Sequence, residues 1–421
     1  HTLQNLISNQ APEEKINAMR KKTGKLVDIQ ANLKKTNNKN NVMREAREIF
    51  YNKDFINKLD SNTNLLCFTN GVVDFKEKSF RKGHPDDYIS KSTNIKYESL
   101  NEKRDQRVIE EIEEFMRQLF PIPELNKYMW DHLASCLIGT NQNQTFNIYT
   151  GSGRNGKSKL VELMSLILGE YKGTVPITLI TQKRNSIGST SSEIVQLMGT
   201  RYAVMQEPSK GDHINEGIMK EITGGDPIQG RALFKDTVTF VPQFKLVVCT
   251  NTMFEIKSND DGTWRRIRVC DFKSKFTENP TTGDPDEPYQ YRVDKKIERK
   301  FEEWKLVFMA MLVSRTFQNQ GNVEDCDIVM AKSMNYREGQ DYLAEFIKEK
   351  IIAKEGCKVK KTELYETFKQ WYTMQYGRGV PKGKELYDFM IKRYGKYKAG
   401  WFNIKINYDD ESSDAESEDS E

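Results

Sequence analysis

The clearest change in the hydrophobic pattern of the chain lies before its middle. A short apolar run at residues 146–150 leads into a turn that contains Gly151, Gly153 and Gly156. Apolar positions then recur at helical spacing, at Val161, Leu163, Met164, Leu166 and Ile167. A strand, a tight turn and a helix form the basic unit of folds in which helices cover a parallel sheet. We therefore expect the rest of the chain to be organised around this segment.

Strands and helices are predicted to alternate in the residues that follow this unit. The pattern predicts strands at 200–205, 244–250 and 264–269, a short helix at 214–222, and two strands, 231–234 and 237–241, around a Lys235-Asp236 turn. Such alternation predicts an α/β fold with its binding site at the carboxyl ends of the strands.

The region before this core is predicted to be mostly helical. Residues 1–42 are polar, and their apolar residues are too sparse for a core. Residues 43–59 show a helical pattern, with Ile49, Phe50, Phe55, Ile56 and Leu59 on one side. A β-like run at 65–75 is broken by an Asn-Gly turn, and a further short strand near 79–81 completes a small hairpin. Helices at 108–119 and 124–138 then lead into the central strand.

The C-terminal part of the chain is predicted to hold a linker, a long helix and a small separate unit. A polar, proline-rich loop at 277–290 precedes a helical pattern at 293–317. Apolar positions further on indicate three helices and then a strand at 402–408, which is the order of a winged-helix domain. Lys396 and Lys398, in the turn before that strand, would contact nucleic-acid phosphates. A small helical module for protein contacts is the alternative.

Length and composition limit the class of protein. The 421 residues are enough for two or three domains. The sequence contains no run of about 18 apolar residues, so no membrane span is predicted. The chain begins with His1 rather than Met and has no signal-peptide pattern, so we expect a piece of a longer, intracellular protein. Its six cysteines are scattered without a C-x-x-C pair, which favours a reducing compartment and argues against disulfides and a zinc site.

The net charge of +4 hides an asymmetry between the body of the chain and its end. Residues 409–421 carry eight acids and no base, which predicts a disordered acidic tail. With 65 basic and 61 acidic residues in the whole chain, residues 1–408 therefore carry a net charge of +12. A positively charged body fits a polyanionic partner such as nucleic acid, although the same charge also serves solubility alone.

The glycine-rich turn carries the chemistry of a phosphate-binding P-loop. Residues 151–158 fit the pattern G-x-x-x-x-G-K-[ST], in which backbone N–H groups and a helix N-terminus surround phosphate oxygens. Lys157 would reach the β- and γ-phosphates, and the Ser158 hydroxyl would bind Mg²⁺. The predicted cofactors are thus ATP and Mg²⁺. The predicted nucleotide-binding residues are Gly151, Ser152, Gly153, Arg154, Asn155, Gly156, Lys157 and Ser158.

Further candidates for ATP hydrolysis follow the turn in order along the chain. Glu207 ends a predicted strand and is the candidate catalytic carboxylate and Mg²⁺ ligand. Asn251 ends the next strand, where it could hydrogen-bond the γ-phosphate and the attacking water. Arg265 and Arg266 follow and could stabilise charge in the transition state, as an arginine finger does.

In this order the motifs resemble those of the superfamily 3 helicases, a branch of the AAA+ ATPases. The resemblance is carried by residues 151–158, Glu207, 220–226 with Arg231, 245–251 and 264–269. The chain is more closely similar to the poxvirus-like primase-helicases of large DNA viruses and to related phage and plasmid primase C-terminal domains. Residues 65–97, with their Asn-Gly-Val-x-Asp core, resemble the domain that precedes the helicase in that family.

The resemblance implies an ATP-driven DNA helicase that acts in replication. It implies a homohexameric ring that moves 3′→5′ along single-stranded or forked DNA, with a primase upstream and a viral replication site in the host cell as its location. Arg265 or Arg266 would serve the neighbouring subunit's nucleotide, and the hairpin with Arg231 and Lys235 would contact DNA in the channel. Many relatives carry two acids where this chain has Gln206-Glu207, so metal binding would rest on Glu207 alone.

The predicted architecture is an AAA+ core between two accessory parts. Its segments are a mostly helical N-terminal collar with a small β-hairpin (1–110), the AAA+ core (111–275), a linker and lid helix (276–335), a winged-helix-like domain (336–408) and the acidic tail (409–421). Two other functions fit the same motifs. One is a P-loop ATPase that packages or remodels DNA without unwinding it, and the other is an origin-binding module in which nucleotide only controls assembly.

Overall fold

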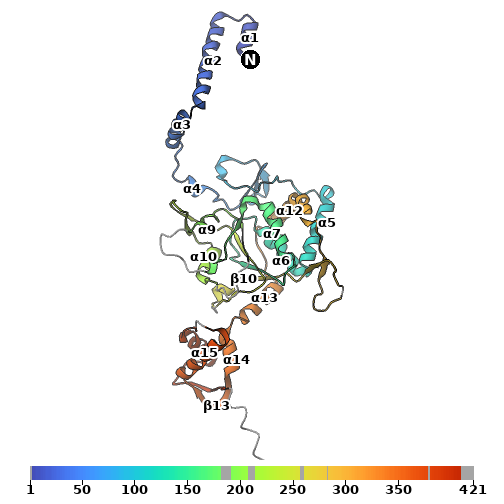
Figure 1. Ribbon diagram of the computed structural model, residues 1–421, viewed down its shortest axis with the longest axis vertical. Coiled ribbons are helices and arrows are strands. Elements are labelled where there is room, and N and C mark those ends of the chain that lie inside the picture. Colours follow the sequence, from blue (N-terminus) through green and yellow to red (C-terminus); the bar gives the residue numbers. More distant parts are fainter. Residues whose placement is uncertain are drawn as a thin grey trace, which may run out of the picture. The chain divides into compact units, whose positions relative to one another are not determined.

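The computed structural model describes residues 2–181, 191–206, 214–256, 260–281, 283–377 and 380–408. The chain divides into two units, His1–Leu59 and Asp60–Glu421 (Figure 1). Glu207 and the predicted acidic tail, 409–421, lie outside the described residues.

Five parallel strands form the central sheet of the larger unit, in the order β10-β4-β9-β6-β5. Their bounds are β4 Phe146–Thr150, β5 Lys172–Thr174, β6 Tyr202–Gln206, β9 Lys245–Thr250 and β10 Ile267–Asp271. The predicted α/β fold with a parallel sheet is therefore confirmed. The strand expected at 264–269 begins later, because residues 261–264 form a short helix that Asp260 caps through the N–H of Thr263.

Helices cover both faces of this sheet, and the side chains of β4 alternate between the two faces. Tyr149 packs with the helices of one face, whereas Phe146 and Ile148 pack with those of the other. The first face is covered by α5 (Glu102–Leu119), α6 (Pro123–Ser135), α7 (Lys157–Leu168) and α12 (Ile297–Asn319). The second face is covered by α8 (Thr178–Thr181), α9 (Ser192–Val195), α10 (Glu216–Gly224) and α11 (Asp261–Trp264). A short 3-10 helix, η2 (Gly169–Tyr171), follows α7.

The open edge of the sheet at β10 is covered by α13 (Asp327–Glu338), which lies beside it (Figure 1). The hydroxyl of Ser333 accepts a hydrogen bond from the N–H of Val269 at 2.9 Å. This bond satisfies a strand N–H that would otherwise lack a partner strand.

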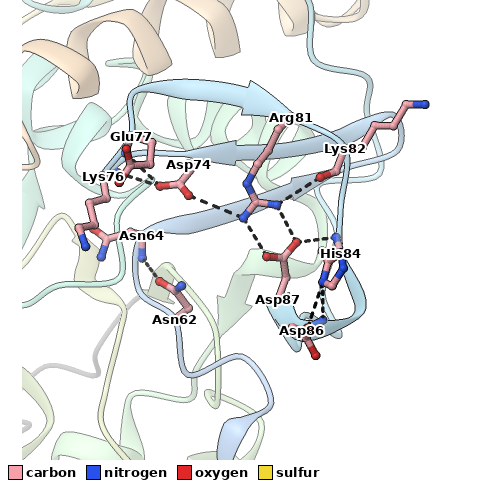
Figure 2. A network of polar contacts seen from close by, with 10 residues as sticks. All are labelled: Asn62, Asn64, Asp74, Lys76, Glu77, Arg81, Lys82, His84, Asp86 and Asp87. Carbon is pink, nitrogen blue, oxygen red and sulfur yellow. Dashed lines mark hydrogen bonds and ion pairs between the residues drawn. The ribbon is translucent and has the colours of Figure 1, made fainter.

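A three-stranded antiparallel sheet precedes α5, where the sequence predicted a small hairpin. It consists of β1 (Leu65–Phe68), β2 (Gly71–Asp74) and β3 (Ser79–Arg81), and η1 (Pro85–Asp87) follows. Arg81 donates two hydrogen bonds to the Asp87 carboxylate, at 2.8 and 2.9 Å, and Asp87 also accepts one from the backbone of His84 (Figure 2). The guanidinium of Arg81 lowers the pKa of Asp87. This network fastens η1 to the edge strand.

A buried arginine joins this small sheet to the parallel sheet. Arg201, only 2% exposed, donates to the carbonyls of Asn62 and Leu65 at 3.3 and 3.1 Å. Gly139 lies so close that a Cβ at this position would meet Nη1 of Arg201 at 1.3 Å. Burial lowers the pKa of Arg201 to about 10 and that of the nearby buried Lys245 to about 8. Two cations thus lie beneath the amino-terminal edge of the sheet.

Two further pairs of strands lie outside the central sheet. β7 (Ile228–Arg231) and β8 (Thr237–Phe240) form an antiparallel hairpin, and β11 (Lys275–Thr277) pairs in parallel with β12 (Gln290–Arg292). The prediction placed the first strand of the hairpin at 231–234. It lies earlier, because residues 232–236 form the loop between the two strands.

The smaller unit holds four helices, and the last three of them bury none of their residues. They are α1 (Thr2–Ser8), α2 (Glu13–Lys34), α3 (Thr36–Ile49) and α4 (Phe55–Lys58). The expectation of one helix through residues 43–59 is wrong, because α3 ends at Ile49. Phe50, which was expected on its apolar side, is 81% exposed.

The C-terminal segment has a hydrophobic core of its own. Its elements are α14 (Tyr342–Lys350), β13 (Ile351–Val359), α15 (Lys361–Tyr376), α16 (Gly383–Tyr394) and β14 (Trp401–Ile406). The three predicted helices and the final strand are present. The pattern did not predict β13, which pairs antiparallel with β14.

Three further features concern the cysteines, the hydrophobicity of the helices and the possible metal ligands. All six cysteines are free. Among the described helices, none is long and apolar enough to cross a membrane. Within the same residues, no three His, Cys, Asp or Glu side chains gather in a way that could hold a metal ion.

Candidate nucleotide-binding site

The loop between β4 and α7 has a backbone that requires glycine. Gly151, Gly153 and Gly156 have φ angles of 154°, 93° and 83°, and Arg154 is also left-handed, at 51°. A Cβ at Gly151 would lie 2.1 Å from the side-chain nitrogen of Asn155. Only glycine lets the loop curl this tightly at these positions.

Lys157, the first residue of α7, is held inside this loop. Its ammonium donates to the carbonyl of Gly151 at 3.1 Å, to Oδ1 of Asn155 at 3.2 Å and to Oδ1 of Asn251 at 2.9 Å. The residue is only 7% exposed. All three of these acceptors are neutral oxygen atoms.

The sheet explains why Asn251, so far from Lys157 in sequence, reaches the same place. β4 and β9 are parallel neighbours, and their register pairs Thr150 with Thr250. The residues that follow, Gly151 and Asn251, therefore leave the sheet side by side at its carboxyl edge. Lys157 and Asn251, both candidate residues from the sequence, are thus in direct contact.

A cavity of about 280 Å³ opens on these groups. It is lined by Gly153, Arg154, Asn155, Gly156, Lys157, Ser158, Lys159, Val161, Cys249, Thr250 and Asn251. The side-chain nitrogen of Asn155 is buried there and has no hydrogen-bond partner. An orphaned donor, an ammonium and a curled glycine backbone fit a ligand with anionic oxygen atoms. Of the predicted loop residues, Gly151 and Ser152 are not part of this lining.

A second cavity, of about 670 Å³, lies against the same loop and shares Arg154, Gly156 and Lys159 with the first. Its remaining lining comes from the end of α5, from β11 and from the segment before α12: Phe115, Gln118, Leu119, Phe276, Thr277, Glu278, Arg292, Val293, Asp294, Lys295 and Ile297. Leu119 and Phe276 pack directly on Gly156, where a Cβ would meet them at 2.2 and 3.2 Å. Sequence reasoning missed this wall, because its residues come from separate segments of the chain whose meeting depends on packing.

Arg265 and Arg266 do not join this site. They precede β10, whose register pairs Ile267 with Phe146 at the start of β4, whereas the loop follows the end of β4. The strand alone separates the two edges by roughly 13 Å. Arg266 is buried and donates to the carbonyl of Gly262, whereas Arg265 is exposed and donates to Gln144 at 2.7 Å.

The predicted DNA-contacting residues lie in two other places. Arg231 ends β7 and Lys235 lies in the hairpin loop, while Lys396 and Lys398 are exposed between α16 and β14. Glu207, the predicted carboxylate, falls outside the described residues, and β6 leads toward it: its last residue, Gln206, pairs with Cys249.

Two protein families match separate parts of the chain. Residues 5–121 match the family described as D5 N terminal like. Residues 149–266, which include the glycine loop and Asn251, match a family of unknown function, DUF5906.

Relatives of the chain occur in large DNA viruses. A putative helicase of Acanthamoeba polyphaga mimivirus is 34% identical over 94% of this chain and 44% of its own length. A putative primase of African swine fever virus is 26% identical over 85% of this chain and 38% of its own. The chain thus spans less than half the length of these relatives.

Among solved structures, the apo structure of the NrS-1 C-terminal region aligns with a TM-score of 0.40 at 12% identity. The alignment covers 61% of this chain and 57% of that one. The sequence matches, over most of this chain, identify it as a member of a D5-like primase-helicase family of large DNA viruses. The resemblance to the primase-helicases of large DNA viruses is confirmed.

Proposed function

We propose that this chain is the ATP-driven helicase part of a viral primase-helicase that acts on DNA in replication. The observation that carries the proposal is the position of Lys157 at the carboxyl edge of a parallel sheet, between the glycine loop and Asn251. An ammonium in a loop of this kind is suited to the β- and γ-phosphates of a nucleotide. The names of the viral relatives support the choice of a helicase among the nucleotide-using proteins.

The residues of the smaller cavity would bind the phosphates of ATP with Mg²⁺. The loop backbone and Lys157 would hold the β- and γ-phosphates, and the exposed Ser158 hydroxyl, with Glu207 as the second candidate, would ligate the metal. Mg²⁺, when bound, would neutralise charge between these phosphates. Asn251, whose Oδ1 accepts from Lys157, would orient the attacking water.

The larger cavity is the proposed place of the base and ribose. It shares Arg154, Gly156 and Lys159 with the smaller cavity, so one molecule could fill both. Its wall of Phe115, Leu119 and Phe276 offers an apolar surface to a flat ring.

An assembly of several subunits would complete the site. A transition state at the γ-phosphate gains from a cation, yet Arg265 and Arg266 lie at the opposite edge of their own sheet. We therefore assign the finger to the nucleotide of a neighbouring subunit, in a closed ring such as a hexamer. Arg265 is the better candidate, because Arg266 is buried and bound to Gly262.

Single-stranded or forked DNA is the proposed partner, with translocation in the 3′→5′ direction. Arg231 and Lys235 on the hairpin, and Lys396 and Lys398 before β14, would contact phosphates. The net charge of +12 on residues 1–408 favours such a partner. The order of elements in 342–406 supports a winged-helix domain there.

The test compares DNA forks that carry a 3′ tail with blunt duplexes, in the presence of ATP and Mg²⁺. We expect phosphate release that single-stranded DNA stimulates, and strand separation of the fork. Lys157→Ala should abolish both, whereas Lys103→Ala, an exposed lysine in the first turn of α5, should abolish neither. Hydrolysis without strand separation would point instead to packaging or remodelling. Stoichiometric use of nucleotide would point to an origin-binding module.

A further inference from the structure

The tip of the β7–β8 hairpin exposes two apolar side chains. Leu233 is 61% exposed and Phe234 is 92% exposed, the largest value among the large hydrophobic side chains of the described residues. The ring of Phe234 gives up few contacts within the protein when a flat partner covers it. Its removal from water would therefore favour binding.

The tip is held in place rather than trailing. The N–H of Lys235 donates to the carbonyl of Ala232 at 3.1 Å, and Nε of Arg231 donates to the carbonyl of Lys235 at 3.2 Å. These bonds keep Phe234 in a left-handed conformation with φ of 58°. The left-handed conformation is strained for a residue other than glycine, and such strain tends to occur at functional sites.

The root of the hairpin is anchored to the segment that begins α9. Ser191 donates from its backbone to the carbonyl of Arg231 at 2.8 Å, and its hydroxyl accepts from the N–H of Arg231 at 3.0 Å. Gly230 packs on Val195, where a Cβ would meet the side chain at 2.9 Å. The ring of Phe234 therefore projects from a fixed base.

Charge and area select the partner of this tip. Arg231 precedes the loop, and Lys235 and Asp236 follow the ring, so the hairpin tip, 231–236, has two basic residues and one acidic residue. A phenyl ring offers only about 200 Å², whereas a stable protein interface needs about 1,000 Å² or more. A single ring beside cations fits one unpaired base and its neighbouring phosphates.

We propose that Phe234 is a base-stacking residue for single-stranded DNA, an inference that rests on the proposed function of the chain. One unpaired base lies on its ring, while Lys235 and Arg231 contact adjacent phosphates. Leu233 widens the apolar surface beside the ring. The hairpin then binds both bases and backbone, and the base contact is independent of sequence, because every base has a flat face.

The experiment measures binding of a fluorescent oligo-dT and of an abasic strand of the same length, which keeps the phosphates and lacks the bases. We expect Phe234→Leu to weaken binding of oligo-dT by about 5- to 100-fold and to leave binding of the abasic strand unchanged. Phe234→Trp should retain the preference for oligo-dT. Lys235→Ala should weaken binding of both strands alike, since it removes a phosphate contact. Phe50→Leu, at an exposed ring in the other unit, is the matched control.

Each outcome decides between the two proposals. If the unmodified chain unwinds DNA and Phe234→Leu binds oligo-dT as tightly as the unmodified chain, the stacking role is wrong and the helicase proposal stands. A changed oligomeric state of Phe234→Leu in size-exclusion chromatography would assign the tip to contact with another copy and overturn stacking. If the unmodified chain binds neither strand, both proposals fail.

Discussion

Asn251 contributes one oxygen atom to the candidate site, and that atom is already engaged by Lys157. The contact fixes which end of the amide faces the cavity, because the oxygen accepts from the ammonium and the NH₂ group is left to point toward a ligand. An asparagine oriented in this way can donate to a phosphate oxygen or hold a water molecule for attack.

We expect Asn251→Ala to lower kcat for ATP by about 100-fold, the usual effect of removing one preorganised polar group. Nucleotide affinity should change only a few-fold, because Lys157 and the loop remain. Steady-state phosphate release, together with titration of a fluorescent nucleotide, separates the two effects. Asn37→Ala, at an exposed residue of α3, controls for the loss of an amide. Equal losses of affinity and kcat would show that Asn251 only binds.

His132 makes stability depend on pH at a distance from the loop. It is buried in α6, its Nε2 lies 2.8 Å from the hydroxyl of Tyr149, and burial lowers its pKa to about 3. Between this value and its ordinary pKa near 6.5, the unfolded chain binds a proton that the folded chain does not. Stability therefore falls as the pH decreases through this window, by up to about 1.4 kcal/mol per pH unit.

The prediction is that His132→Gln flattens the loss of unfolding free energy between pH 6.5 and pH 5. Urea denaturation at both pH values measures it, with the unmodified chain in parallel. Glutamine retains a hydrogen-bonding group for Tyr149 without a proton to gain. The same slope in both proteins would mean that His132 is reached by water and titrates normally.

At the scale of elements, Arg201 ties the three-stranded sheet to the parallel one through its hydrogen bonds, and it packs directly against Gly139. We expect Gly139→Ala to destabilise the chain by about 1–3 kcal/mol, since the guanidinium is enclosed and the new methyl group has no space. Thermal and urea unfolding measure the change. Gly24→Ala, in α2 with nothing within 4 Å, is the matched control and should not destabilise. An unchanged midpoint for Gly139→Ala would mean that Arg201 moves aside freely.

The elements differ in how well the sequence predicts them, and the reasons are physical. β4 and α7 were predicted correctly, because a fully buried strand and an adjoining helix give strong and different hydrophobic patterns. β13 was missed, because most of its residues are exposed and it has no alternation. The loop residues 232–234 were taken as a strand, since Leu233 and Phe234 are apolar although they face water.

The candidate site also has one part that the sequence predicts and one part that it does not. Lys157 and Asn251 could be placed together from sequence, because parallel strands end at one edge. The larger cavity could not, since Leu119, Phe276 and Ile297 come from three segments whose meeting depends on packing. Nor does the sequence separate Arg265 from Arg266, which the structure distinguishes by burial and by the bond of Arg266 to Gly262.

At the scale of the assembled molecule, the separation of the loop from Arg265 predicts that Arg265 serves the nucleotide of a neighbouring subunit. Arg265→Ala and Lys157→Ala chains should each be inactive alone, because a finger is worth about 10³–10⁵ in rate. Mixed with exchange of subunits, they should regain activity. In head-to-tail contacts about a quarter of the interfaces would join an intact loop to an intact Arg265.

Phosphate release after mixing measures this recovery. A chain with both substitutions, mixed with Lys157→Ala, is the control, because no interface then holds an intact loop. If subunits demonstrably exchange and activity never returns, the finger acts within its own subunit or lies elsewhere, and a shared site is excluded.

One backbone contact links the two cavities. The N–H of Phe276 donates to the carbonyl of Arg154 at 2.8 Å. This bond connects the apolar wall of the larger cavity to the left-handed turn that shapes the smaller one. Binding of the nucleotide base against this wall would also order the turn. The phosphates would then bind to a turn that is already ordered, with a smaller loss of conformational entropy. The two halves of one nucleotide would thus bind cooperatively, each raising the affinity for the other.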